Sequence, residues 1–361
     1  MPERKDLKKT LVIICITYMT AAMLIMPSKT MAAAENALVL CANAVIPSVF
    51  PFIFCANMFI SLGAAGLAGR YLSKIMRPLF NIPGSGAVAA VLGVISGYPV
   101  GAICASSLYS RGECTKSEAE RMLAFCNNSG PMFIIGAVGV QMSGSFRIGV
   151  LLYIIHILSA FLTGIVFGRI KKEKTQTRAL PYAMQDSGLK DAVYDLGGAI
   201  EKSVDSILKI CGFVVIFGVF CAALPQGEVR PFVYSFFEIT GGTYELLSKF
   251  GLSALPIISG IIAFSGVSVA AQVMSIIIPS GLSAKSYITG KLSQGGIAFL
   301  LTYIYLKIFP QTVAVFGALH NSPPYMPTTG QLTATSFITI ALAAAAFLLI
   351  FIIGKIFDCF K

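Results

Sequence analysis

The sequence predicts an all-α polytopic membrane protein. Hydrophobic residues make up 56% of the 361 positions and charged residues only 12%, and the mean hydropathy is +0.81. A soluble domain carries about twice that charged fraction. Several uncharged runs are long enough to cross a bilayer as helices. No long polar segment separates them, so we expect one compact membrane domain.

The net charge of +11 is carried by short loops between the apolar runs. Lys and Arg gather in cytoplasmic loops under the positive-inside rule, so this charge reports orientation and does not indicate nucleic acid. The nine cysteines are scattered, without a CxxC or a Cys/His pattern. We therefore expect no metal, no disulfide framework and no cofactor, and no motif indicates an enzyme.

Residues 1–35 predict an N-terminal membrane anchor helix or a signal peptide. Basic residues precede the apolar stretch Leu11–Met26, and Thr30–Ala34 resembles a small-residue cleavage site. Both interpretations place the chain near Glu35 outside the membrane.

Residues 36–170 predict a first unit, in which a helix is followed by a hairpin. Asn36–Gly69 is uncharged and predicts one long helix that ends at cytoplasmic basic residues. Leu79–Ser110 would rise about 48 Å as a straight helix, against a hydrocarbon core of about 30 Å. It is also rich in Gly and Pro. A re-entrant hairpin over 79–110, turning near Gly97–Gly101, places the downstream basic cluster inside, whereas a single crossing would place it outside.

Two spans, Met122–Gln141 and Ile148–Gly168, complete the first unit, and residues 171–202 predict a cytoplasmic linker. Between the hairpin and these spans, Arg111–Arg121 predicts a solvated connector that begins a short helix. Thr115 or Ser117 would cap that helix, with Glu118 and Glu120 at its positive end.

Residues 203–308 predict a second unit with the same order of elements. Ser203–Leu224 crosses outward, and 232–249 predicts a second hairpin with Gly241 and Gly242 at its middle. This hairpin enters from outside, whereas the first enters from the cytoplasm. The sequence therefore predicts two inverted repeats, each with a re-entrant helical hairpin.

The remaining spans follow from the same alternation. Leu252–Pro279 returns inward to a loop that contains Lys285 and Lys291, and Gly290–Ile308 crosses outward. Residues 309–361 predict an external loop and a C-terminal transmembrane helix, Phe337–Ile356.

Polar, glycine-broken segments lie at matching places in the two units. Interrupted hydrophobic segments in both halves are the strongest sequence pointer to a transporter's binding site. Unwound backbone at membrane depth is tolerated only where protein or a water-filled cavity satisfies it, and half-helix N-termini attract anionic groups. We expect one solute site near the midplane, formed by Ser96, Gly97, Tyr98, Pro99, Gly101, Asn127, Asn128, Ser129, Gly130, Thr240, Gly241, Gly242, Ser265, Ser268 and Gln272.

Close helix packing is the alternative role for the small residues of this set. Packing is favoured for a single serine such as Ser268. Binding is favoured for Asn127–Pro131, because two adjacent amides point to different helix faces. Glu238 is a candidate for a coupling cation or proton, with a solvated position as the equal alternative. His156 is expected to be hydrogen-bonded within the bundle, with proton relay as the alternative.

At Ser96–Ala102, Ser117–Arg121 and Leu123–Gly136 the chain resembles the YlbJ-like sporulation integral membrane proteins. These form part of a wider group with a nucleoside-recognition, or Gate, domain, shared with spore maturation proteins and the membrane part of FeoB iron transporters. The resemblance runs from about Asn36 to Ile308 and is more specific in the first half. It implies an endospore-forming bacterial source and a fold similar to concentrative nucleoside transporters.

The resemblance further implies a role in sporulation, with movement of dipicolinate toward the developing spore as the activity. Dipicolinate is a small planar dianion, which suits helix N-termini and amides. We therefore expect a transporter of a small polar or anionic solute, and the alternatives are a nucleoside-like permease and a non-transporting sporulation membrane scaffold. The expected location is the bacterial cytoplasmic membrane or a membrane around the developing spore. The expected partners are the solute, the bilayer, and a second copy or other sporulation membrane proteins.

Overall fold

The computed structural model describes residues 3–62, 64–170 and 189–309, and within these ranges the regular structure is helical. The first part of the chain forms α1 (Glu3–Ile25), α2 (Pro27–Leu40), the π-helical turn η1 (Cys41–Val45), α3 (Ile46–Ser61) and α4 (Ala64–Phe80). Next come α5 (Gly86–Ile95), α6 (Val100–Ser110), α7 (Lys116–Phe125), the π-helical η2 (Met132–Met142) and α8 (Phe146–Ile170). The last described part forms α9 (Leu189–Ala222), α10 (Arg230–Phe237), α11 (Ile239–Phe250), the 3₁₀ turn η3 (Gly251–Ala254), α12 (Leu255–Phe264), α13 (Gly266–Ile277) and α14 (Lys285–Ile308).

Several of these helices are long and apolar enough to cross a membrane. By length and composition they are Phe146–Ile170, Leu196–Ala222 and the run Ile239–Ile277. A fourth candidate is the pair Val12–Ile25 and Pro27–Asn43, which is bent by 109°. Shorter apolar helices such as Gly86–Ile95 pack among them. The described part of the chain is therefore all-helical, with several apolar helices, as in a polytopic membrane protein.

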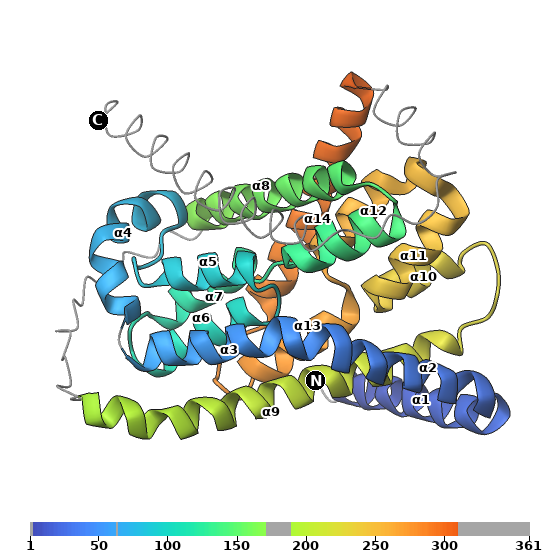
Figure 1. Cartoon of the computed structure of the whole chain (residues 1–361), viewed down its shortest axis with the longest axis horizontal. Helices are drawn as coiled ribbons and strands as arrows, with labels where there is room; N and C mark the ends of the chain where they lie inside the picture. The colour runs from blue at the N-terminus through green and yellow to red at the C-terminus, as the bar shows by residue number, and fades with distance from the viewer. Residues whose placement is uncertain (1–2, 63, 171–188, 310–361) are drawn as a thin grey trace.

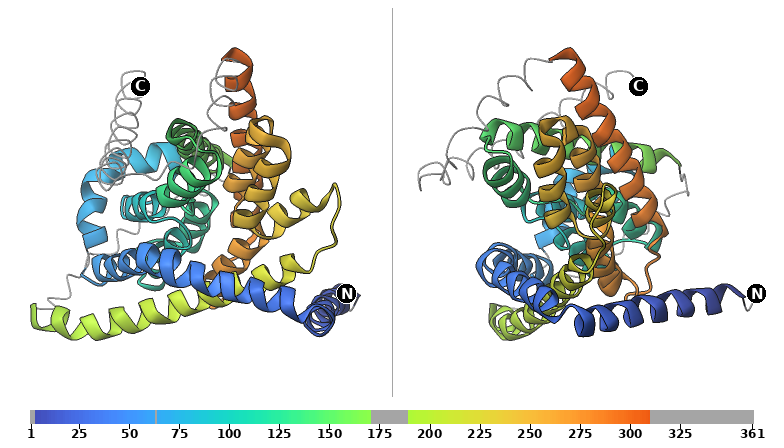
Figure 2. Two further views of the ribbon diagram at one scale, coloured as in Figure 1. Left: turned by 45° about the vertical axis from the view of Figure 1, so that its right-hand side comes forward. Right: turned by 90° about the vertical axis from the view of Figure 1, so that its right-hand side faces the viewer.

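The helices form a bundle with one long helix along its edge. In Figure 1, α2 and α3 run beside α9, and these elements are in contact. The right-hand view of Figure 2 shows α1 extending away from the bundle. Inside it, α14 packs on α7, α8 and α12. This places one face of α14 against the end of α7.

The two segments with predicted hairpins each contain a pair of short helices. α5 and α6 pack against each other and are separated at Ser96–Pro99, inside the segment where the turn was expected. α10 and α11 also pack against each other, but they separate at Glu238 and not at the predicted Gly241–Gly242. Both glycines lie in the first turn of α11. The absence of a side chain at Gly242 lets α11 approach the backbone of Ser235 in α10.

Three further local predictions were wrong. Asn36–Gly69 is not one helix, because α3 ends at Ser61 and α4 starts anew at Ala64. The Arg111–Arg121 connector is not fully solvated, since the side chains of Glu118 and Arg121 are buried. Lys285 and Lys291 are not in a loop, because both belong to α14.

The linker predicted over 171–202 lies partly outside the described residues, and its remainder, from Leu189, is the start of α9. The predicted external loop and C-terminal helix after Phe309 also lie outside the described residues.

Candidate functional site

The first interruption in the helical structure separates α7 from η2. α7 begins with a capping box, in which Glu118 N donates to Thr115 Oγ1 at 3.2 Å and Thr115 N donates to Glu118 Oε2 at 2.8 Å. The helix ends at Phe125, and residues 126–130 are not helical. Pro131 then opens the next helix, where its missing N–H costs nothing. The Asn-Asn-Ser-Gly-Pro run is thus an interruption held between two helices.

The polar residues of this interruption are buried and held by other elements. Asn127, Asn128 and Ser129 expose 1% of their surface or less. Ser129 N donates to His156 Nε2 of α8 at 3.1 Å, so His156 is hydrogen-bonded within the bundle, the interpretation favoured from the sequence. Ser129 Oγ reaches Ile262 O of α12 at 3.4 Å. The freed Phe125 carbonyl accepts from Asn128 Nδ2 at 2.8 Å.

One face of α14 adds a second set of polar groups. Tyr287, Lys291 and Gln294 each expose 1% of their surface or less. Lys291 Nζ donates to Gln294 Oε1 at 2.8 Å. Gln294 Nε2 donates in turn to Asn128 Oδ1 at 3.0 Å and to His156 O at 3.4 Å. A continuous chain of hydrogen bonds therefore runs from the Lys291 ammonium to the first interruption.

Some buried polar atoms in this region have no partner among the described residues. They are Oδ1 and Nδ2 of Asn127, the Tyr287 hydroxyl, Ser96 Oγ and His156 Nδ1. The Asn127 side chain and the Tyr287 hydroxyl face each other without reaching hydrogen-bond geometry. A buried polar group left unpaired costs about 1–3 kcal/mol. A cluster of such groups therefore marks a place where a ligand can supply the missing partners.

The tip of the first hairpin packs directly on the interruption. Gly97 has φ +87°, and a Cβ atom there would lie 2.8 Å from Gly130 N. A Cβ atom at Gly101 would come even closer to the carbonyl oxygen of Cys126. Tyr98, between these two glycines, lies close to Ser129. The structure thus brings Ser96–Gly101 together with Asn127–Gly130, as expected for a shared site.

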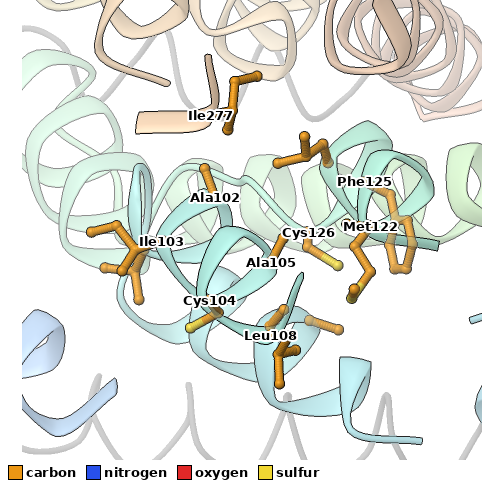
Figure 3. Close-up of a cluster of buried hydrophobic side chains, with 14 of the residues drawn as sticks. Ala102, Ile103, Cys104, Ala105, Leu108, Met122, Phe125, Cys126 and Ile277 are labelled. Atoms are coloured by element: carbon orange, nitrogen blue, oxygen red, sulfur yellow. The ribbon is translucent and has the colours of Figure 1, made fainter. Parts of the chain in front are cut away.

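An apolar cluster supports this contact from the other side of the hairpin. Figure 3 shows side chains of α6, among them Ala102 and Ala105, gathered with Met122 and Phe125 from the end of α7 and with Cys126, which follows it. The polar interruption therefore starts where a tightly packed apolar layer ends.

The second hairpin meets the second interruption in a similar way but with simpler chemistry. Ser265 has φ +77° and separates α12 from α13, and its N still donates to Ile261 O at 2.9 Å. The next residue, Gly266, has φ +72° and lies against Phe236 and Ile239 of the second hairpin. Ser268 and Gln272 are buried further along α13.

Glu238 acts as the N-cap of α11. Its two carboxylate oxygens accept from Thr240 N and Gly241 N, each at 2.8 Å. A carboxylate at a helix N-terminus also interacts favourably with the helix dipole. The coupling-ion candidate thus has a structural partner for each oxygen.

Lys291, Gln294 and Tyr287 were missed as site residues. The signal was present, because spacings of four and three along Tyr287-x₃-Lys291-x₂-Gln294 place three polar side chains on one helix face. Within the described ranges, no three His, Cys, Asp or Glu side chains group as metal ligands.

Comparisons with known proteins agree with the resemblance noted from the sequence. Residues 43–146 match the family model described as Gate, nucleoside recognition. Over 330 residues the chain is 28% identical to the sporulation integral membrane protein YlbJ of Bacillus subtilis (strain 168). The aligned region covers 80% of this chain and 81% of the relative. No solved structure matches. The predicted resemblance is confirmed, and with the apolar helices above it identifies a multi-pass integral membrane protein.

Proposed function

We propose that this protein is a membrane carrier for a small polar or anionic solute, with dipicolinate or another small carboxylate as the leading candidate, and that it acts in sporulation. The relative's name supports the sporulation role. The Gate match over residues 43–146 includes the first hairpin tip and the first interruption, which supports a solute site at their contact.

The observation that carries this proposal is the Asn127 side chain. It is fully buried at a helix interruption, and neither its oxygen nor its nitrogen has a partner in the described structure. A buried amide offers two donors and one acceptor oxygen. Evolution seldom leaves such a group unpaired without a function. A solute that hydrogen-bonds to Asn127 gives the group its partner.

The order of elements supports a transporter built from two repeats. The pair α5–α6 is followed by the interrupted α7–η2 and the long α8. The pair α10–α11 is followed by the interrupted α12–α13 and the long α14. In each half the hairpin tip packs on the interruption through a glycine with positive φ, Gly97 or Gly266. We propose that the two halves are inverted repeats, arranged as in concentrative nucleoside transporters.

A nucleoside-like permease is the second candidate. The Gate description favours it, as do the uncharged amides of Asn127 and Asn128, which can bind the hydroxyl groups and base edges of a nucleoside.

Uptake into vesicles containing the purified protein tests the proposal. Labelled dipicolinate is the first substrate and a labelled nucleoside the parallel one. We expect saturable dipicolinate uptake that is lost in Asn127→Ala/Asn128→Ala. Asn57→Ala is the control, because Asn57 is a partly buried amide that has a partner: it donates to Ser203 Oγ at 3.0 Å, between α3 and α9.

Each outcome separates the candidates. Uptake that persists in the double variant would refute the site. Uptake of the nucleoside alone would show that the protein is a nucleoside-like permease. Folded protein that takes up neither solute would favour the scaffold and overturn the carrier.

A further inference from the structure

Lys291 is a lysine buried inside the helical bundle. Its side chain is on the face of α14 that packs against α7, and the residue exposes 1% of its surface. Gly290 beside it packs against the backbone of Ala124, so the two helices are in close contact at this point. Burial of an ammonium group is strongly unfavourable unless the charge is paired. Lys291 therefore calls for a specific explanation.

The described structure provides Lys291 with one neutral hydrogen-bond partner. Nζ donates to Gln294 Oε1 at 2.8 Å, and no acidic side chain of the described ranges forms an ion pair with it. An ammonium group has three donors. Two donors and the positive charge thus remain for another group.

The groups around Lys291 are donors of the kind that a carboxylate accepts. Tyr287 lies one turn before Lys291 on α14, and its buried hydroxyl has no partner. That hydroxyl faces Asn127, whose Nδ2 also has no partner. Gln294 links Lys291 to Asn128 of the same interruption. One buried cluster therefore holds a cation, a hydroxyl and an amide, each with an unused donor.

We propose that Lys291 is the specificity-determining cation of this site and pairs with a carboxylate group of the transported solute. This rests on the proposed function and assigns the residue that selects a carboxylate over a neutral solute. Gln294 is a positioning residue, which holds the ammonium group beside the first interruption. The Tyr287 hydroxyl and Asn127 Nδ2 donate to the same carboxylate. A charged pair made inside a low-dielectric bundle is stronger and more selective than the same pair in water.

A purely structural role is the competing explanation. The carboxyl end of α7 is negative, and a cation near it is stabilising. Under that explanation, removal of the charge lowers stability and leaves the choice of solute unchanged.

The decisive experiment changes the charge of the protein and of the solute together. Purified protein in vesicles is tested for uptake, and in detergent for equilibrium binding, with dipicolinate and with its neutral isostere pyridine-2,6-dicarboxamide. The variants are the wild type, Lys291→Gln and Lys291→Arg. Thermal stability is measured for each.

We expect the wild type to prefer the dicarboxylate. Lys291→Gln should reduce that preference by about ten- to a hundredfold, because one charge-assisted hydrogen bond is lost. Lys291→Arg should keep part of the preference, since the charge remains. Equal loss of stability in both variants with an unchanged preference would establish the structural role and overturn the proposal.

A second variant keeps the test decisive if Lys291→Gln does not fold. Tyr287→Phe removes a buried hydroxyl that has no hydrogen-bond partner in the described structure and that is proposed to donate to the same carboxylate. We expect this variant to fold as the wild type does and to lose about fivefold of the preference for the dicarboxylate, because a hydrogen bond to a charged group is stronger than one to a neutral group. An unchanged preference would refute the carboxylate site around Lys291.

The failures of the two proposals are distinguishable. Dipicolinate uptake by the wild type with no change in preference on Lys291→Gln leaves the carrier intact and overturns the role of Lys291. A wild type that takes up only a nucleoside, or no solute, overturns both.

Discussion

The two helix interruptions occupy equivalent places in the order of elements but differ in how their backbone is satisfied. The first extends over residues 126–130, and its groups depend on distant partners, His156 of α8 and Gln294 of α14. The second is confined to Ser265, whose N–H keeps its helical partner, the Ile261 carbonyl. The first interruption is therefore a polar segment held by side chains of other helices, and the second is a local kink between two helices.

The unpartnered buried side-chain atoms of the described residues are concentrated around the first interruption. Five of them belong to Ser96, Asn127, His156 and Tyr287, whereas the second hairpin holds two, Thr243 Oγ1 and Arg230 Nε. In the second half, Gly241 and Gly242 approach Tyr234 and Ser235, which is a packing role. The buried groups without a partner therefore lie mainly at the first of the two interruptions.

The largest expected effect compares the glycines at which the hairpins meet the interruptions. In Gly97→Ala, the new Cβ would lie 2.8 Å from Gly130 N, a backbone atom, at a residue with φ +87°. We expect a loss of about 2–5 kcal/mol of stability. In Gly266→Ala, the nearest atom is a side-chain carbon of Ile239 at 2.9 Å, which can move. We expect a loss of about 1–3 kcal/mol there.

Thermal unfolding in detergent measures both variants. Gly136→Ala is the matched control, because a Cβ at this helical glycine meets no atom within 4 Å. If Gly266→Ala proved more damaging than Gly97→Ala, the second interruption would be the more rigid one and the comparison would be reversed.

An intermediate effect is expected at His156, the partner of the first interruption. His156→Phe keeps a ring of similar size but removes the nitrogen that accepts from Ser129 N at 3.1 Å. The buried N–H is then unpaired, which costs about 1–3 kcal/mol. Tyr153→Phe, on the same helix, should cost less, because it removes a hydroxyl that donates to Val94 O at 3.1 Å and leaves no N–H unpaired.

Chemical denaturation of both variants provides the measurement. Equal stability of His156→Phe and the wild type would mean that the first interruption is satisfied by other means. It would then resemble the second.

The sequence predicts the first interruption well because its signals are local. Asn127–Pro131 combines turn-forming residues with a proline, and Thr115 with Glu118 forms the capping box that such a spacing specifies. The second interruption was placed near Ser265 for a similar reason, since a serine and a glycine stand within an apolar run. Local chemistry of this kind depends little on the rest of the fold.

The sequence fails where packing decides. From its charge alone, Lys291 is predicted to lie in a loop, because burying a charged side chain in an apolar segment is energetically unfavourable. Only the approach of α14 to α7 shows that Gln294 and Asn128 lie beside it. Gly241 and Gly242 predict a turn, yet Glu238 caps the helix just before them and the chain turns there. Contacts between distant segments are not encoded in local patterns.

The smallest expected effect is at Ser265, and its sign is opposite. Ser265 has φ +77°, a conformation that costs an L-residue about 1–2 kcal/mol and glycine very little. Its hydroxyl is 3.5 Å from Ala263 O, at the limit of a hydrogen bond, so little is lost with it. Glycine loses about 0.5–1 kcal/mol more backbone entropy on folding. Ser265→Gly should therefore leave stability unchanged or raise it by about 1 kcal/mol.

Solute uptake by the same variant tests the comparison most directly. If the second interruption is a kink, Ser265→Gly preserves the backbone geometry and uptake should stay within about twofold of the wild type, equivalent to less than about 0.5 kcal/mol. Ser129→Gly, its counterpart in the first interruption, should reduce uptake more, because Ser129 Oγ bridges to Ile262 O of α12. Loss of uptake in a stable Ser265→Gly protein would mean that the hydroxyl binds the solute. Recognition would then be shared by both interruptions, because the only group removed is one that the fold does not need.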